Sequence, residues 1–135
     1  MRIPSRRVRP KMRVRQSSLI RCPAHLRWVR SHRCVIEGIE TVANTPRNGL
    51  GYHVNQHVCG GIIEAMHVRT GTDGSTGEKP SDCWTIPGCT VAHREQHSIG
   101  ERAFERKYRI DMKALAAEMW RVSPAGVKWR KENDK

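Results

Sequence analysis

Short apolar runs separated by polar loops, rather than long apolar stretches, dominate the hydrophobic pattern of this chain. Residues 61–69 (GIIEAMHVR) form one run and residues 83–86 (CWTI) a second. Runs of this length bounded by turn-forming residues are typical of strands. The glycine-rich sequence between them, residues 70–82, predicts a mobile loop, and Pro87 and Gly88 predict the end of the second strand.

The segment after the second run has the signals of a helix. Thr90 is of a type that caps helix N-termini, and Gly100 is of the type that ends helices. We therefore predict a helix from Thr90 to about Ile99. His93 and His97 are spaced i, i+4 within it, which places both imidazoles on one face about one turn apart.

Two further helices are predicted towards the C-terminus. Phe104 and Tyr108, spaced i, i+4, indicate a helix over residues 101–108 with one face inward. Asp111 is predicted to cap a last helix and Pro124 to end it. The residues expected in the buried stripe of that last helix are Leu115 and Met119. Residues 125–135 are polar and are predicted to form a frayed tail.

The N-terminal half is less regular. Pro23 suits the first position of a short helix that ends near Ser31. The arginines of this segment face solvent or, alternatively, phosphate. Residues 37–58 are predicted to be an inserted loop, with one short strand at residues 51–54.

Charge is concentrated at the N-terminus. The chain has a formal charge of +12, and residues 1–21 carry eight basic residues and no acid, or +8, which leaves +4 for the remainder. Such a segment is typical of a disordered arm that binds polyanions through phosphates. A tail that only aids solubility is the alternative. Nucleic acid is the partner that this pattern favours.

The chain has five cysteines, and this odd number argues against a complete disulfide framework. No apolar run approaches the roughly 18 residues of a membrane span, and no signal sequence is evident. We therefore expect a cytoplasmic protein without a membrane partner. There, clustered Cys and His residues more often bind metal than form disulfides, although buried cysteines can also act as small hydrophobic residues. Aromatic residues make up only 5% of the chain, and a metal commonly stabilises so small a core.

Three histidines suggest hydrolytic chemistry. His67 ends the first predicted strand, and His93 and His97 have the spacing with which one helix supplies two ligands to a divalent metal. Phosphodiester hydrolysis needs a base that takes a proton from water and a cation that stabilises charge on the phosphate. Histidine suits the base, since its ordinary pKa lies near neutral pH. Surface histidines on an ordinary helix are the alternative.

The motifs EAMHVRTGTDG, KPSDCW and C-x3-H-x3-H together resemble prophage-type HNH endonucleases of the ββα-metal, or His-Me finger, superfamily. They are similar in particular to the family of the recombination enhancement nuclease Ref. The resemblance covers about residues 23–124. It implies an α+β fold with a small ββα-metal, treble-clef-like core in residues 22–124, flanked by helices and preceded by the basic arm.

The resemblance also implies roles for residues. His67 matches the general base, and His93 and His97 match the metal-binding histidines. Asp82 or Trp84 falls where many relatives have an orienting Asn. Where relatives have a metal-binding residue, this chain has Met66, for which Glu64 or Asp82 could compensate. We take Asp82 as the third metal ligand.

Three cysteines fall where relatives place structural zinc ligands: Cys34, Cys59 and Cys89. Cys83 or His57 could supply the fourth ligand, because the helix start has Ala92 in place of a ligand. Cations near the proposed site that could contact phosphates are Arg69, Lys79 and Arg94.

The function expected is therefore that of a metal-dependent DNA endonuclease in phage or prophage recombination or DNA processing. Its cofactors would be Mg, Mn or Zn at the catalytic site and a structural zinc. Its partner would be DNA, contacted through phosphates, and a recombinase filament is suggested by the resemblance alone. The alternative is an HNH-fold nucleic-acid-binding or accessory protein that has lost catalysis.

Overall fold

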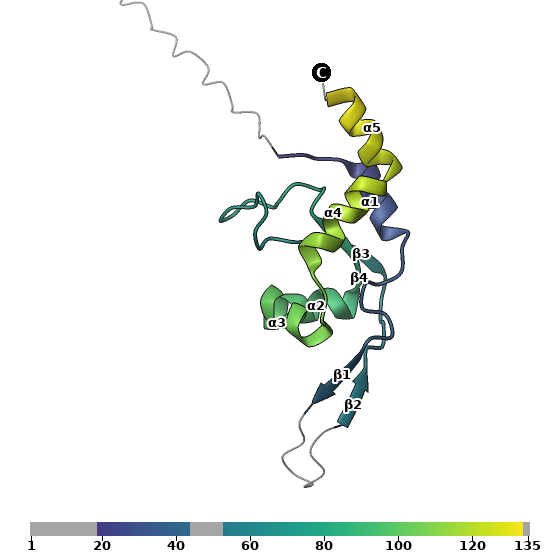
Figure 1. Cartoon of the computed structure of the whole chain (residues 1–135), viewed down its shortest axis with the longest axis vertical. Coiled ribbons are helices and arrows are strands. Elements are labelled where there is room, and N and C mark those ends of the chain that lie inside the picture. The colour runs from purple at the N-terminus through teal and green to yellow at the C-terminus, as the bar shows by residue number, and fades with distance from the viewer. Residues whose placement is uncertain (1–18, 44–52, 134–135) are drawn as a thin grey trace, which may run out of the picture.

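The computed structural model describes residues 19–43 and 53–133, which form a mixed α+β structure with five helices and two two-stranded antiparallel sheets (Figure 1). The basic arm predicted for residues 1–21 lies outside this description except for its last three residues. The elements in chain order are α1 (Pro23–Arg30), β1 (Glu40–Ala43), β2 (His53–Gln56), β3 (Ile63–His67), β4 (Thr85–Cys89), α2 (Thr90–Ile99), α3 (Glu101–Tyr108), α4 (Met112–Val122) and α5 (Pro124–Asn133).

The central sheet pairs β3 with β4 and places His67 opposite Thr85. The prediction that β4 would end at Pro87 is wrong, because the strand continues to Cys89. Pro87 is tolerated because, among residues 19–43 and 53–133, no other strand pairs with the outer edge of β4. The Pro87 carbonyl points to that edge and accepts the backbone N–H of Val35 at 2.8 Å, so the missing proline N–H costs no ladder bond.

Helix α2 follows β4 directly and ends at Gly100, as predicted. Its N-terminal cap is Cys89 rather than Thr90, because the Cys89 sulfur accepts the Ala92 N–H at 3.3 Å. The Thr90 hydroxyl instead accepts the backbone N–H of Ile62 at 3.2 Å and so ties the helix start to the segment before β3. Gly100 adopts φ 87° and ψ 157°, which directs the chain into α3.

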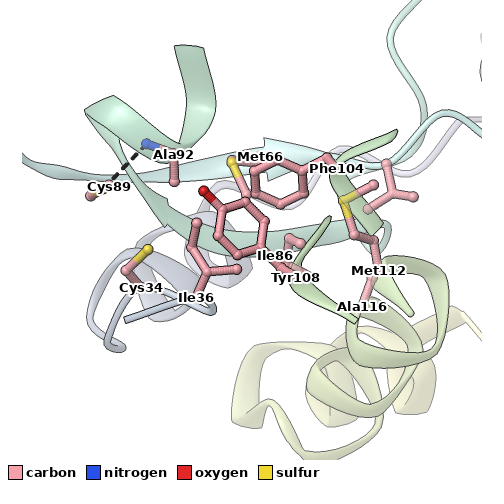
Figure 2. Close-up of a cluster of buried hydrophobic side chains, with 11 residues drawn as sticks. Cys34, Ile36, Met66, Ile86, Cys89, Ala92, Phe104, Tyr108, Met112 and Ala116 are labelled. Atoms are coloured by element: carbon pink, nitrogen blue, oxygen red, sulfur yellow. Dashed lines mark hydrogen bonds between the residues drawn. The ribbon is translucent and has the colours of Figure 1, made fainter. Parts of the chain in front are cut away.

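The core lies between the central sheet and helices α2, α3 and α4, and Figure 2 shows its side chains. Phe104 and Tyr108 are buried on α3, and Asp111 caps α4, as predicted. The buried stripe of α4 was assigned wrongly, because Met112 and Ala116 are its buried residues. Leu115 packs at the margin of the core and Met119 is half-buried.

Two segments are more regular than the sequence suggests. The loop predicted for residues 37–58 contains an antiparallel hairpin of β1 and β2, with Val42 opposite Val54, which projects at the end of the molecule opposite α5 (Figure 1). The tail predicted for residues 125–135 is helix α5 as far as Asn133, and it packs against α1 and α4. Within residues 19–43 and 53–133, no helix is long and apolar enough to cross a membrane.

Candidate functional site: a histidine cavity and a Cys/His cluster

The three histidines singled out in the sequence line one cavity of about 400 Å³. His67 enters it from the end of β3, whereas His93 and His97 enter it from α2. Arg30 of α1 also lines this cavity, although the sequence offered no reason to separate it from the other arginines of that helix. The other polar residues that line this cavity, which we call the histidine cavity, are Glu64, Arg69 and Lys79.

His67 has a defined partner in the buried carboxylate of Asp82. The His67 Nε2 lies 3.0 Å from Asp82 Oδ1. A carboxylate only accepts hydrogen bonds, so in the neutral ring the proton lies on Nε2 and the lone pair on Nδ1. Burial lowers the pKa of His67 from its ordinary value, and the hydrogen bond that the ring donates to Asp82 offsets this only in part. This shift favours the neutral ring, whose Nδ1 can accept a proton.

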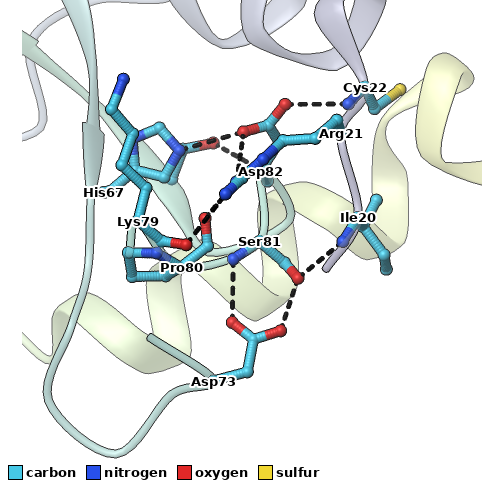
Figure 3. Close-up of polar contacts among 10 residues, drawn as sticks. Ile20, Arg21, Cys22, His67, Asp73, Lys79, Pro80, Ser81 and Asp82 are labelled. Carbon is cyan, nitrogen blue, oxygen red and sulfur yellow. Dashed lines mark hydrogen bonds and ion pairs between the residues drawn. The ribbon is translucent and has the colours of Figure 1, made fainter. Parts of the chain in front are cut away.

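Asp82 is held by residues 20–22, where the predicted basic arm ends (Figure 3). Its Oδ2 accepts the Cys22 N–H at 2.8 Å, and its Oδ1 also lies 3.4 Å from an Arg21 guanidinium nitrogen. The Asp82 N–H donates to the Ile20 carbonyl at 2.9 Å. Both carboxylate oxygens thus have protein partners. These contacts suit a role for Asp82 in orienting His67 better than they suit the role of metal ligand expected from the sequence.

The helix histidines face one another. The Nε2 atoms of His93 and His97 are 3.1 Å apart, and His93 Nδ1 lies 3.4 Å from Glu64 Oε2. Arg94 lies beside both rings in an adjoining hollow. Met66, which precedes the expected base, does not line the cavity and is fully buried in the core (Figure 2).

The other two cations from the sequence analysis also line the histidine cavity, but their backbone groups have structural roles. The Arg69 N–H donates to the Glu101 carboxylate at 2.8 Å, and the Lys79 carbonyl accepts from Arg21 at 3.0 Å. Trp84 was the alternative to Asp82 as an orienting residue. Its ring instead lies under the Lys113 ammonium, whose nitrogen is 5.6 Å from the ring centroid.

A second cluster is formed by the side chains of Cys34, His57, Cys59 and Cys89. Their donor atoms all lie within 4.8 Å of one another, and His57 Nε2 is 3.4 Å from the Cys89 sulfur. Three thiols and one imidazole are a donor set typical of structural zinc. This cluster could therefore hold a metal ion such as zinc, and it is the one group of this kind in residues 19–43 and 53–133.

Local electrostatics favour metal coordination by two members of this cluster, Cys89 and His57. Although burial acts to raise it, the pKa of the Cys89 thiol is held below its usual range by the backbone N–H groups of Ala92 and Gly60. Such N–H groups also stabilise a metal-bound thiolate. Burial lowers the pKa of His57, which keeps its ring neutral and able to coordinate.

The structure decides between the two candidates for the fourth member of the cluster. His57 belongs to it, whereas Cys83 does not. Cys83 is buried elsewhere, and its burial, together with the charge of Asp73, raises its pKa to about 11. The close spacing of His57 and Cys59 was the local signal for this outcome, but the turn that returns them to Cys34 depends on the β1–β2 hairpin.

Comparisons of the chain with models of known families, with curated proteins and with solved structures return no match. The functional conclusions therefore depend on the residues and their geometry.

Proposed function

We propose that this protein is a metal-dependent phosphodiesterase of the HNH type that acts on DNA. The observation that carries the proposal is that His67, His93 and His97 line one cavity together with three cationic side chains. The order strand, strand, helix for β3, β4 and α2 is the order expected of a ββα-metal core. Neither the sequence motifs nor this order of elements would alone be enough to support the proposed activity.

The residues divide into three roles. His93 and His97 would hold a divalent cation, which supplies charge stabilisation of the phosphate and of the departing 3′ oxygen when bound. His67 is neutral and takes the proton from the attacking water through Nδ1, because Asp82 occupies Nε2. The cations that bind the flanking phosphates are Arg30, Arg69 and Lys79.

We propose further that the Cys34, His57, Cys59 and Cys89 cluster binds a structural zinc ion. Its members come from the segment after α1, the segment after β2 and the junction of β4 with α2. A zinc ion there joins the hairpin to the central sheet and α2. Because small cores gain much of their stability from such a site, the cluster supports the fold and leaves catalysis to the histidine cavity.

DNA is the proposed partner because cationic side chains line the histidine cavity and the basic arm leads towards it. Arg30 and Lys79 line it, and the chain enters the described structure at residues 19–22, beside Asp82 and Lys79. The preceding residues 1–18 contain seven of the basic residues. Such a distribution neutralises phosphates without reading bases, so cleavage with little sequence preference and binding with a steep salt dependence are expected.

The test is plasmid cleavage with Mn²⁺ or Mg²⁺ by the wild type, by His67→Ala and by His32→Ala. His32 serves as the matched control. It follows the C-terminus of α1, and its Nδ1 is hydrogen-bonded to the Trp28 carbonyl at 2.7 Å. We expect His67→Ala to lower the rate by about 10²–10⁴-fold and His32→Ala to leave it unchanged. Cleavage that persists in His67→Ala rejects this base. Salt-sensitive DNA binding without cleavage by the wild type would instead support the non-catalytic alternative.

A further inference from the structure

One acidic side chain reaches the helix histidines from the neighbouring strand. Glu64 of β3 lines both the histidine cavity and the hollow beside it, and its Oε2 lies 3.4 Å from His93 Nδ1. Glu64 and His93 are partly buried, with side-chain exposures of 35% and 28%. An imidazole that ligates a metal through one nitrogen usually donates its other N–H to a carboxylate or carbonyl, which fixes the tautomer and the ring orientation.

The remaining nitrogen of His93 points at His97. Two imidazole nitrogens, each about 2.0–2.1 Å from one cation, are separated by about 3.0 Å at a right angle and about 3.4 Å at a tetrahedral angle. The observed Nε2 to Nε2 distance of 3.1 Å falls between these values. The same distance allows a hydrogen bond between the two rings, and it is compatible with both Nε2 atoms binding one cation, which leaves His93 Nδ1 for Glu64.

We infer that Glu64 is a positioning residue of this metal site, accepting the His93 Nδ1–H so that His93 Nε2 and His97 Nε2 face one cation. The inference rests on the proposed role of His93 and His97 as ligands. Two imidazoles favour borderline transition metals over Mg²⁺, which prefers oxygen ligands. The site accordingly favours divalent transition metals over Mg²⁺, and Mn²⁺, the weakest binder of that series, is the probe used below.

This inference leaves Asp82 out of the metal site. Both oxygens of Asp82 are occupied by His67, Arg21 and Cys22, whereas Glu64 is the acid that contacts a proposed ligand. The proposed base and one of the two proposed metal ligands thus each contact a carboxylate: His67 contacts Asp82, and His93 contacts Glu64.

The test is titration calorimetry of Mn²⁺ and, separately, Mg²⁺ into zinc-loaded full-length protein. We expect His93→Ala to abolish Mn²⁺ binding and Glu64→Ala to weaken it by about 10–100-fold. Glu64→Gln, whose amide oxygen still accepts the His93 N–H, should recover most of that loss. Glu118→Ala, which removes an exposed acid of α4 paired with Arg121, is the control and should bind Mn²⁺ as the wild type does. Circular dichroism verifies that each variant is folded.

The outcomes separate this inference from the proposed nuclease activity. Unchanged Mn²⁺ affinity in Glu64→Ala overturns the inference even if plasmid is cleaved. An equal loss in Glu64→Gln and Glu64→Ala also overturns it, since Glu64 would then act through its charge or as a direct ligand. Mn²⁺ binding that depends on Glu64 in a protein that never cleaves DNA supports the inference and rejects the nuclease. Absence of Mn²⁺ binding in the wild type rejects both.

Discussion

The Nε2 of His67 lies 3.0 Å from the Oδ1 of Asp82, and this pair connects the end of β3 with the loop before β4. Asp82 is itself fixed by the Cys22 N–H at 2.8 Å. The chain that follows the basic arm therefore orients the proposed base through one buried carboxylate. Three segments distant in sequence therefore meet at the His67–Asp82 pair.

Replacement of Asp82 by Asn should impair catalysis without removing the metal. The amide can present its NH₂ group to His67 and favour the other tautomer, which moves the proton to Nδ1. We expect the plasmid cleavage rate to fall by about 10²–10⁴-fold, with the Mn²⁺ affinity unchanged. The control is Asp111→Asn, because Asn caps a helix as well as Asp does. If Asp82→Asn loses Mn²⁺ affinity instead, Asp82 is a metal ligand.

Local signals account for what the sequence predicted well. The spacing of His93 and His97, the stop at Gly100 and the inward pair on α3 all lie within single helices, where periodicity and capping dominate. His67 at the end of a strand follows from the same local reasoning. The histidine cavity could therefore be anticipated, although Arg30 became part of it only through the packing of α1 against the central sheet.

Non-local packing accounts for what the sequence did not predict. Pro87 continues β4 because, in the part of the chain that the structure describes, the outer edge of that strand has no strand partner, which no local rule indicates. Residues 125–133 form a helix because α1 and α4 supply a surface for it to pack against. The assignment of His57 to the Cys/His cluster required the hairpin register, in which Val42 lies opposite Val54. These outcomes depend on tertiary contacts rather than on propensity.

Loss of a cluster cysteine should remove zinc, whereas loss of a cysteine outside the cluster should not. We expect one zinc per wild-type chain and none in Cys59→Ser, with a stability loss of more than about 3 kcal/mol. Cys59 is exposed, so lost core packing cannot explain such an effect. The control is Cys83→Ser, which alters a buried thiol outside the cluster and should retain zinc.

Metal analysis and urea unfolding of the two variants check this prediction. Equal loss of zinc from both variants would contradict the assignment of the cluster. So would zinc-free wild-type protein with fewer than five titratable thiols, since the cysteines would then form a disulfide.

Gly100 joins α2 to α3 in a conformation that other residues avoid. Its φ of 87° and ψ of 157° lie in a region that is essentially restricted to glycine. No atom outside its neighbours lies within 4 Å of a Cβ built there, so Gly100→Ala tests backbone strain without a clash. We expect a stability loss of about 1–3 kcal/mol by urea unfolding. Ser98→Ala, at an exposed position of α2, should change stability by less than about 0.5 kcal/mol. Equal effects of the two substitutions would contradict the strain argument.

His25 should make the stability of the protein depend on pH. Its ring is fully buried, with Nδ1 2.8 Å from the Ser123 hydroxyl, and its Nε2 has no hydrogen-bond partner among the described residues. Burial lowers the pKa of His25 from 6.5 to about 4, although the charge of Asp82 opposes this shift. The unfolded chain therefore binds a proton below pH 6.5 that the folded chain does not bind until about pH 4.

The contribution of His25 to stability is thus complete above pH 6.5 and is lost as the pH falls to about 4, by about 3 kcal/mol in total. We expect His25→Gln to remove this part of the pH dependence when urea unfolding is measured at pH 7, 6, 5 and 4. Since carboxylates also titrate in this range, the relevant quantity is the difference between wild type and variant at each pH. His32→Gln, at a half-exposed histidine, should follow the wild type. A difference between wild type and His25→Gln that is the same at every pH would show that the ring contributes packing alone.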